Sequence, residues 1–210
     1  MTTRQFLFVL AFCGLVQAER ASAAVALLDD VTVRIYDSAG LPAGVKQSAL
    51  AVAAQTLTVA SLGVKWEACD AATRPASCAA PPAANQFIVR IVHSARSAVQ
   101  APRGQLPLGD AFIDRVSRSG VLATIYVDRV MLLAVLAGAD AATLLGRAIA
   151  HEMGHLLLAT NAHATHGLMR AVWSGDQLRR ERPIDWTFTR QEIAAIRERV
   201  EAARVGWGTR

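Results

Sequence analysis

The sequence predicts an α+β fold in which a twisted mixed sheet packs on a long N-terminal helix and on a second helix that carries the chemistry. The first half alternates a strand pattern, a long helical run and further short strand patterns, and helical patterns return in the second half. The chain has 210 residues, of which 53% are hydrophobic and 19% charged. This length and composition suit one domain with a buried core and argue against disorder.

The first 23 residues have the pattern of a secretory signal peptide. Arg4 precedes an apolar run from 6 to 16, and small residues follow, with cleavage expected after Ala18 or after Ala23. An uncleaved anchor or a buried first helix is the alternative interpretation. We therefore expect a protein exported to the periplasm or the extracellular space, whose mature domain spans residues 24–210.

Alternation of apolar and polar residues predicts the strands of the sheet, at 31–36, 64–66, 86–92, 110–114 and 121–127. A turn at 117–120 joins the last two. The strand at 121–127 is open to two interpretations: an ordinary sheet strand, or an edge that pairs with an extended peptide.

Helical spacing of apolar residues predicts four helices, at 45–62, 128–138, 141–159 and 189–204. Gly63 is placed to end the first helix, and Asp140 is placed to cap the third. The segment from 160 to 183 is expected to be irregular.

Cys69 and Cys78 are the two cysteines of the expected mature chain and flank a short loop. Two cysteines so placed in an oxidising compartment are expected to form a disulfide, which stabilises by about 2 to 3 kcal/mol. Two free thiols are expected only if the chain is not exported.

The charge pattern excludes several classes of protein. The chain has 22 basic and 17 acidic residues, and the basic ones are scattered, which argues against a nucleic-acid binder. No stretch approaches the roughly 18 to 20 uncharged apolar residues that cross a bilayer. We expect a monomer that has no stable membrane span after processing.

Four of the five histidines lie between positions 151 and 166, and two of them belong to the string His151-Glu152-Met153-Gly154-His155. On a helix, His151 and His155 project from one face and both reach one metal ion, while Glu152 contacts a water on that metal. This is the H-E-x-x-H signature of zinc peptidases. The alternative is a pair of core histidines satisfied by their neighbours.

A catalytic zinc usually takes a third protein ligand. The extended signature H-E-x-x-H-x-x-G-x-x-H requires glycine and histidine where this chain has Leu158 and Asn161. We expect the helix to reverse near Asn161, so that His163 returns as the third ligand. His166 is an alternative ligand, an oxyanion donor or an exposed side chain. A downstream carboxylate such as Glu192 is the third ligand in a gluzincin-type arrangement.

The stretch from 151 to 170 resembles the metzincin-type zinc metallopeptidases, and more closely a group of small secreted bacterial proteins expected to be peptidases, with the motif H-E-x-G-H-L-L-L-x-x-x-x-H-x-x-x-G-L-M-R. Weaker similarity extends over 33–69 and 123–129. The resemblance implies a metzincin-like single domain with the motif helix beneath the sheet. It also implies that Met169 forms a Met-turn, an apolar floor beneath the metal, for which ordinary core packing is the alternative.

These patterns predict a secreted zinc-dependent metallopeptidase of the metalloendopeptidase kind, acting on a peptide or protein. Zn²⁺ held by His151, His155 and His163 would activate a water, and Glu152 would be the general base. The alternatives are a non-catalytic exported zinc-binding protein, a binding module with a decayed site, and the gluzincin-type peptidase.

Trp173 and Trp186 flank a polar stretch that contains Arg179, Arg180 and Arg182. Two interpretations are open. The stretch forms one wall of a cleft that favours acidic side chains, or it is an exposed charged face.

Overall fold

The computed structural model describes residues 29–70, 74–83, 85–94 and 107–207. The predicted signal peptide lies outside the described residues. No helix within the described ranges is long and apolar enough to cross a membrane.

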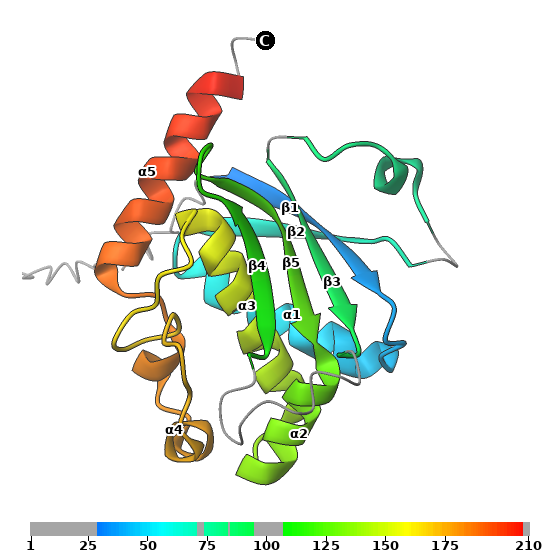
Figure 1. Cartoon of the computed structure of the whole chain (residues 1–210), viewed down its shortest axis with the longest axis vertical. Helices are drawn as coiled ribbons and strands as arrows, with labels where there is room; N and C mark the ends of the chain where they lie inside the picture. The colour runs from blue at the N-terminus through cyan, green and yellow to red at the C-terminus, as the bar shows by residue number, and fades with distance from the viewer. Residues whose placement is uncertain (1–28, 71–73, 84, 95–106, 208–210) are drawn as a thin grey trace, which may run out of the picture.

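One five-stranded mixed sheet forms the centre of the fold, as expected for an α+β protein (Figure 1). Its strands are β1 (Asp29–Asp37), β2 (Leu62–Ala68), β3 (Gln86–Val92), β4 (Gly109–Asp114) and β5 (Ser119–Tyr126). They lie in the order β2-β1-β3-β5-β4, and all pairs are parallel except the hairpin of β4 and β5.

The hairpin corrects one of the sequence interpretations. β5 pairs with β3 on one side and with β4 on the other, so it has no free edge for a peptide. The free edge on this side of the sheet belongs to β4. Alternation along a strand reports which face is buried but not which strands lie beside it, which is why the sequence left this point open.

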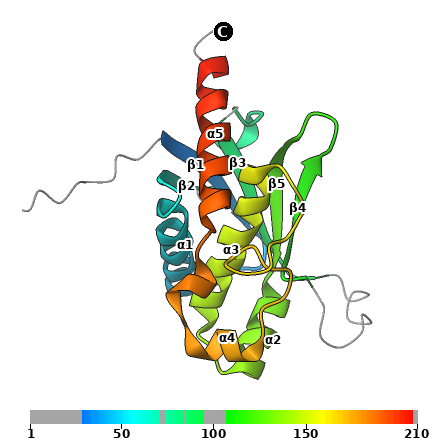
Figure 2. The same ribbon diagram turned by 90° about the vertical axis from the view of Figure 1, so that its left-hand side faces the viewer.

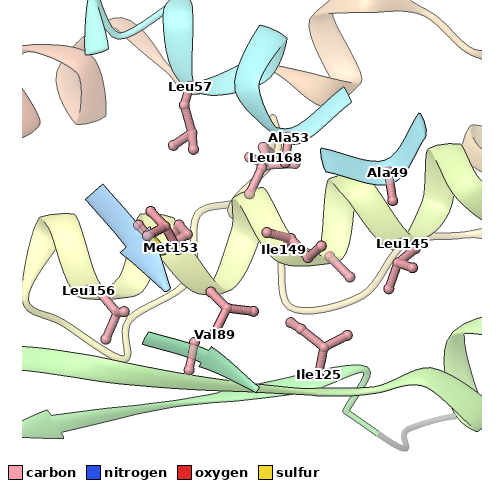
Figure 3. Packing of buried hydrophobic residues seen from close by; sticks show 14 of the residues in the cluster. Ala49, Ala53, Leu57, Val89, Ile125, Leu145, Ile149, Met153, Leu156 and Leu168 are labelled. Carbon is pink, nitrogen blue, oxygen red and sulfur yellow. The ribbon is translucent and has the colours of Figure 1, made fainter. Parts of the chain in front are cut away.

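Five α-helices complete the described fold: α1 (Ala43–Thr58), α2 (Val127–Ala137), α3 (Ala141–Leu158), α4 (Gly175–Arg180) and α5 (Arg190–Trp207). The side view in Figure 2 shows α1 and α3 on the same side of the sheet. α3 packs between α1 and the strands, and apolar side chains from these elements form the core (Figure 3).

The two long helices approach closely because α3 has a glycine at their contact. A Cβ added to Gly146 would lie 2.4 Å from the carbonyl oxygen of Ala49 and 2.7 Å from Cβ of Val52, both on α1. Only a residue without a side chain fits there, so Gly146 sets the spacing of the two helices.

The structure differs from the predicted helices chiefly at three points. α1 ends at Thr58 rather than at Gly63, because the chain turns at Ser61, which has φ 64°, and enters β2 at Leu62. α3 is followed by the reversal at Ala159, with φ 48° and ψ 47°, rather than near Asn161. The segment expected to be irregular contains α4, whose N-terminus is a capping box of Ser174 and Gln177.

A disulfide joins Cys69 and Cys78, whose Cα atoms lie 5.7 Å apart. The buried guanidinium of Arg34 holds the loop that follows against the sheet. It donates to the carbonyl oxygen of Ala80 at 2.7 Å and to Oε1 of Gln86 at 2.5 Å. This loop is therefore anchored by a covalent bond and by charge-assisted hydrogen bonds to β1.

Candidate metal centre

α3 places His151 and His155 side by side on one buried face. Asp140 caps the helix by accepting from the backbone N–H of Thr143, as the sequence predicts. The four-residue spacing of the two histidines brings their Nε2 atoms to 3.1 Å from each other. Both rings are buried.

Two backbone carbonyls fix the protonation of these rings. Nδ1 of His151 lies 2.9 Å from the oxygen of Leu168, and Nδ1 of His155 lies 2.8 Å from the oxygen of Thr160. A carbonyl oxygen only accepts, so each Nδ1 carries the hydrogen and each neutral ring presents a lone pair at Nε2. Trp173 donates to the same Leu168 oxygen at 3.2 Å and stands edge-on to His151.

His163 completes the cluster. After the reversal at Ala159, the chain brings its ring centroid to 5.4 Å from that of His151 and 4.8 Å from that of His155. Ligand nitrogens of the three histidines all lie within 4.8 Å of one another. The third histidine is thus where the sequence analysis expects it, although the reversal that delivers it occurs two residues earlier.

His166 and Glu192 lie outside this cluster. His166 is exposed and contacts the hydroxyl of Thr165. The carboxylate of Glu192 accepts from the backbone N–H of Thr189 at 2.7 Å, and the backbone N–H of Glu192 donates to the Thr189 hydroxyl, which together cap α5. Neither residue is among the groups that converge on His151 and His155.

Met169 packs directly beneath the motif helix. Its sulfur would lie 2.5 Å from a Cβ added to Gly154, and the ring of Phe188 would lie at 2.8 Å. The loop that carries Met169 turns at Gly167, which has φ +78° and whose added Cβ would lie 2.7 Å from the carbonyl oxygen of Thr187. At 154 any side chain would displace Met169 and Phe188, and at 167 glycine is favoured by the nearby backbone oxygen and by the left-handed backbone.

The electrostatics of the cluster favour neutral imidazoles. Burial lowers the pKa of His151 to about 4, and it lowers the pKa of His155 and of His163 as well. At pH 7 two inward-facing lone pairs therefore stand 3.1 Å apart, with no proton between them. A divalent cation shared by the rings satisfies these atoms, so the donor set fits zinc.

Glu152 follows His151 on α3 and lies against the edge strand β4, and it lines the same cavity as the histidines. A Cβ added to Gly109 would lie 2.5 Å from Cγ of Glu152, so glycine at this point of β4 makes room for the carboxyl group. Burial, assisted by the charge of Asp110, raises the pKa of Glu152 to about 8. A cation bound by the neighbouring histidines would favour its ionised form.

The cluster opens into a cavity of about 670 Å³. Its walls come from the start of β4, from α2, from α3 and from the segment after α3. Several lining residues were not singled out by the sequence analysis, namely Asp110, Arg129, Leu132, Leu136, Arg170 and Val172. Arg170 ends the motif on which the resemblance rests, and Arg129 ends the stretch of weaker similarity at 123–129; the other four carried no such signal.

The polar stretch at 176–183 does not line this cavity. Arg179 and Arg180 are exposed and form ion pairs with Asp176. They therefore match the second of the two interpretations, an exposed charged face. Trp173 lines the cavity, and Trp186 lies behind it, with the two ring centroids 5.3 Å apart.

The sequence matches no model of a known protein family, and no curated protein is significantly similar to it.

Proposed function

We propose that the chain is an exported zinc-dependent metallopeptidase, similar to the metzincin type, that hydrolyses peptide bonds. The observation that carries the proposal is the pair of Nε2 atoms of His151 and His155. Their lone pairs are fixed by backbone carbonyls, face each other at 3.1 Å and lie beside His163. Export rests on the sequence pattern of residues 1–23.

The three histidines would hold the zinc ion, and a zinc ion so held supplies Lewis acidity, which polarises a carbonyl and acidifies water. Glu152 would act as the general base. Its carboxylate oxygen takes a proton from the attacking water and delivers it to the nitrogen of the leaving amine. Glycine at position 109 leaves room for this carboxyl group, which lines the same cavity as the three histidines.

The edge of β4 would bind the peptide backbone. Gly109 and Ala111 line the cavity, and no strand of the described residues pairs with the outer edge of β4. An extended peptide adds to such an edge through main-chain hydrogen bonds, which place its backbone beside Glu152.

The geometry favours catalysis over a purely structural zinc site. Structural zinc is usually enclosed by four protein ligands, whereas three residues converge here among the described ones and a cavity opens beside them. Burying the carboxyl group of Glu152 lowers the stability of the fold, and Glu152 is not part of the ligand cluster. A general base explains its presence.

Glu152→Gln tests the proposal. We expect the variant to bind zinc with unchanged stoichiometry and to lose hydrolysis of a mixed peptide library by at least roughly 100-fold, because the amide takes up no proton. Measured zinc content and mass-spectrometric detection of products check this. Unchanged hydrolysis would refute the role of Glu152, and zinc-loaded wild-type protein that cleaves no peptide would refute the peptidase proposal.

A further inference from the structure

We propose that the cavity selects substrates that carry a carboxylate next to a large apolar side chain, and that Arg129 binds this carboxylate. The inference rests on the proposed function in one respect: the ligand of the cavity is a peptide. It concerns the end of the cavity formed by α2 and by the segment that follows α3.

Arg129 is a fixed cation that forms no ion pair with a carboxylate of the described residues. Its guanidinium lies 4.1 Å from the ring centroid of Tyr126, and Nη1 donates to the carbonyl oxygen of Pro107 at 2.8 Å. Its buried Nε has no hydrogen-bond partner, and no carboxylate of the described residues forms an ion pair with it. The adjacent carboxylate of Asp128 is attracted by the charge of Arg129, but its hydrogen bonds come from Ser94.

An arginine held in this way is suited to bind a carboxylate. Stacking on Tyr126 and the bond to Pro107 fix the plane of the guanidinium before any ligand arrives, which reduces the entropy lost on binding. The remaining N–H groups have the fork geometry that matches the two oxygens of a carboxylate.

Arg170 adds positive charge to the same cavity. Its side chain is only 10% exposed, and its Nη2 lies 3.5 Å from Oδ1 of Asp185. Its Nε is buried without a hydrogen-bond partner. Because Asp185 already neutralises part of this charge, Arg129 is the principal partner that we assign to the substrate.

The neighbouring wall is apolar and solvent-exposed. Leu132 and Leu136 of α2 line the cavity with 55% and 74% of their surface exposed, and Val172 lines it with 57% exposed. Large aliphatic side chains grouped around a cavity are a typical surface for burying an apolar ligand group. Val135, on the same helix and 80% exposed, does not line the cavity.

The cavity holds acidic as well as basic side chains. Glu152 of α3 and Asp110 of β4 line it together with Arg129 of α2. A substrate carboxylate is repelled by the two acidic groups and attracted by Arg129. Its source is either the C-terminus of the peptide, which makes the protein a carboxypeptidase, or the side chain of an Asp or Glu.

Binding to zinc-loaded Glu152→Gln protein tests the inference without turnover. The probes are two matched pairs: acetyl-Ala-Ala-Leu as free acid and as amide, and acetyl-Leu-Glu-Ala-amide against acetyl-Leu-Gln-Ala-amide. We expect at least tenfold tighter binding, by calorimetry, for the carboxylate member of one pair. The first pair identifies a terminal carboxylate, and the second an acidic side chain.

Variants then assign the effect to residues. In the same background, Arg129→Gln should bring the affinity ratio within about twofold of one, while Arg180→Gln, which removes an exposed arginine outside the cavity, should leave the ratio unchanged. Arg129→Lys keeps the charge without the fork and should give an intermediate ratio. Leu136→Ser should weaken binding of the leucine peptides at least threefold, whereas Val135→Ser should not.

Equal affinities within both pairs, or a ratio that Arg129→Gln does not change, would overturn the inference. The outcome is separable from that of the proposed function. If the protein prefers carboxylate peptides but cleaves none, the carboxylate site is supported and the peptidase proposal is refuted. If it cleaves peptides without any carboxylate preference, the peptidase proposal is supported and the carboxylate site is refuted.

Discussion

The chemistry of the histidine pair is decided by atoms that no substitution can remove, the carbonyl oxygens of Leu168 and Thr160. They impose the Nδ1–H tautomer on His151 and His155, and thereby direct both lone pairs at one point. Within the described residues no backbone carbonyl orients His163 in this way, and it is the most exposed of the three. Substitution of His163 therefore tests the contribution of a single ligand to zinc binding most cleanly.

We expect His163→Ala to weaken zinc binding by roughly 100-fold or more, because a ligand is lost and not merely reoriented. His166→Ala is the matched control three residues away and should leave zinc affinity unchanged. Competition with a chromophoric chelator measures both. Unchanged affinity in the first variant, or a comparable loss in the second, would show that the third ligand is assigned wrongly.

Glu152 makes the stability of the metal-free protein depend on pH. Its pKa is raised from 4.5 to about 8, so the unfolded chain gives up this proton first as the pH rises. The stability that the protonated carboxyl group contributes is complete below pH 4.5 and is lost as the pH rises to 8. The histidines have the opposite sign, since their lowered pKa values cost stability as the pH falls below 6.5.

Glu152→Gln removes the ionisable carboxyl group and keeps the histidines. The contribution of the histidines to the pH dependence of stability therefore cancels when the variant is compared with the wild type. Between pH 5 and pH 8, we expect the free energy of unfolding of the variant to rise relative to that of the wild type by roughly 3 to 4 kcal/mol. Urea unfolding in the presence of a chelator measures the difference. If the difference in free energy of unfolding between the variant and the wild type is the same at both pH values, Glu152 ionises normally in the folded protein.

At the scale of elements, the packing of α1 on α3 depends on Gly146. An added methyl group at this position meets the backbone of Ala49 at 2.4 Å, where no side chain can move aside. We expect Gly146→Ala to lower the free energy of unfolding by about 1 to 3 kcal/mol.

Gly44 provides the matched control, because it lies in α1 and a Cβ added there meets nothing within 4 Å. Gly44→Ala should leave stability unchanged or raise it by up to about 1 kcal/mol. Thermal and urea unfolding of the two variants measure this contrast. Equal effects would show that helix propensity, and not the close approach of the helices, governs position 146.

The elements also show what local sequence determines. β3 has the predicted bounds, and α3 begins after Asp140 as predicted, because alternation and a capping side chain are local signals. The predicted first helix is too long because its apolar spacing continues to Val59 and no local signal marks the turn before Leu62, where β2 begins. The prediction lacks α4, although Ser174 and Gln177, three residues apart, are a readable capping box.

At the scale of the whole molecule, the cluster and the cavity differ in how far the sequence predicts them. His151, Glu152, His155 and His163 lie within 13 residues, so helical spacing and one chain reversal suffice to bring them together. The hairpin of β4 and β5, whose turn the sequence predicts, leads directly into α2 and so places Arg129 beside β4. The packing of α3 against this hairpin, which closes the cavity, joins segments far apart in the chain, and local patterns do not encode it.

The most direct test of the account is the anomalous scattering of zinc, measured at its absorption edge in crystals of the zinc-loaded protein. The account predicts one peak per chain, at bonding distance from Nε2 of His151, Nε2 of His155 and a ring nitrogen of His163. A map without a peak between these three rings, or with the metal held by other residues, would contradict it.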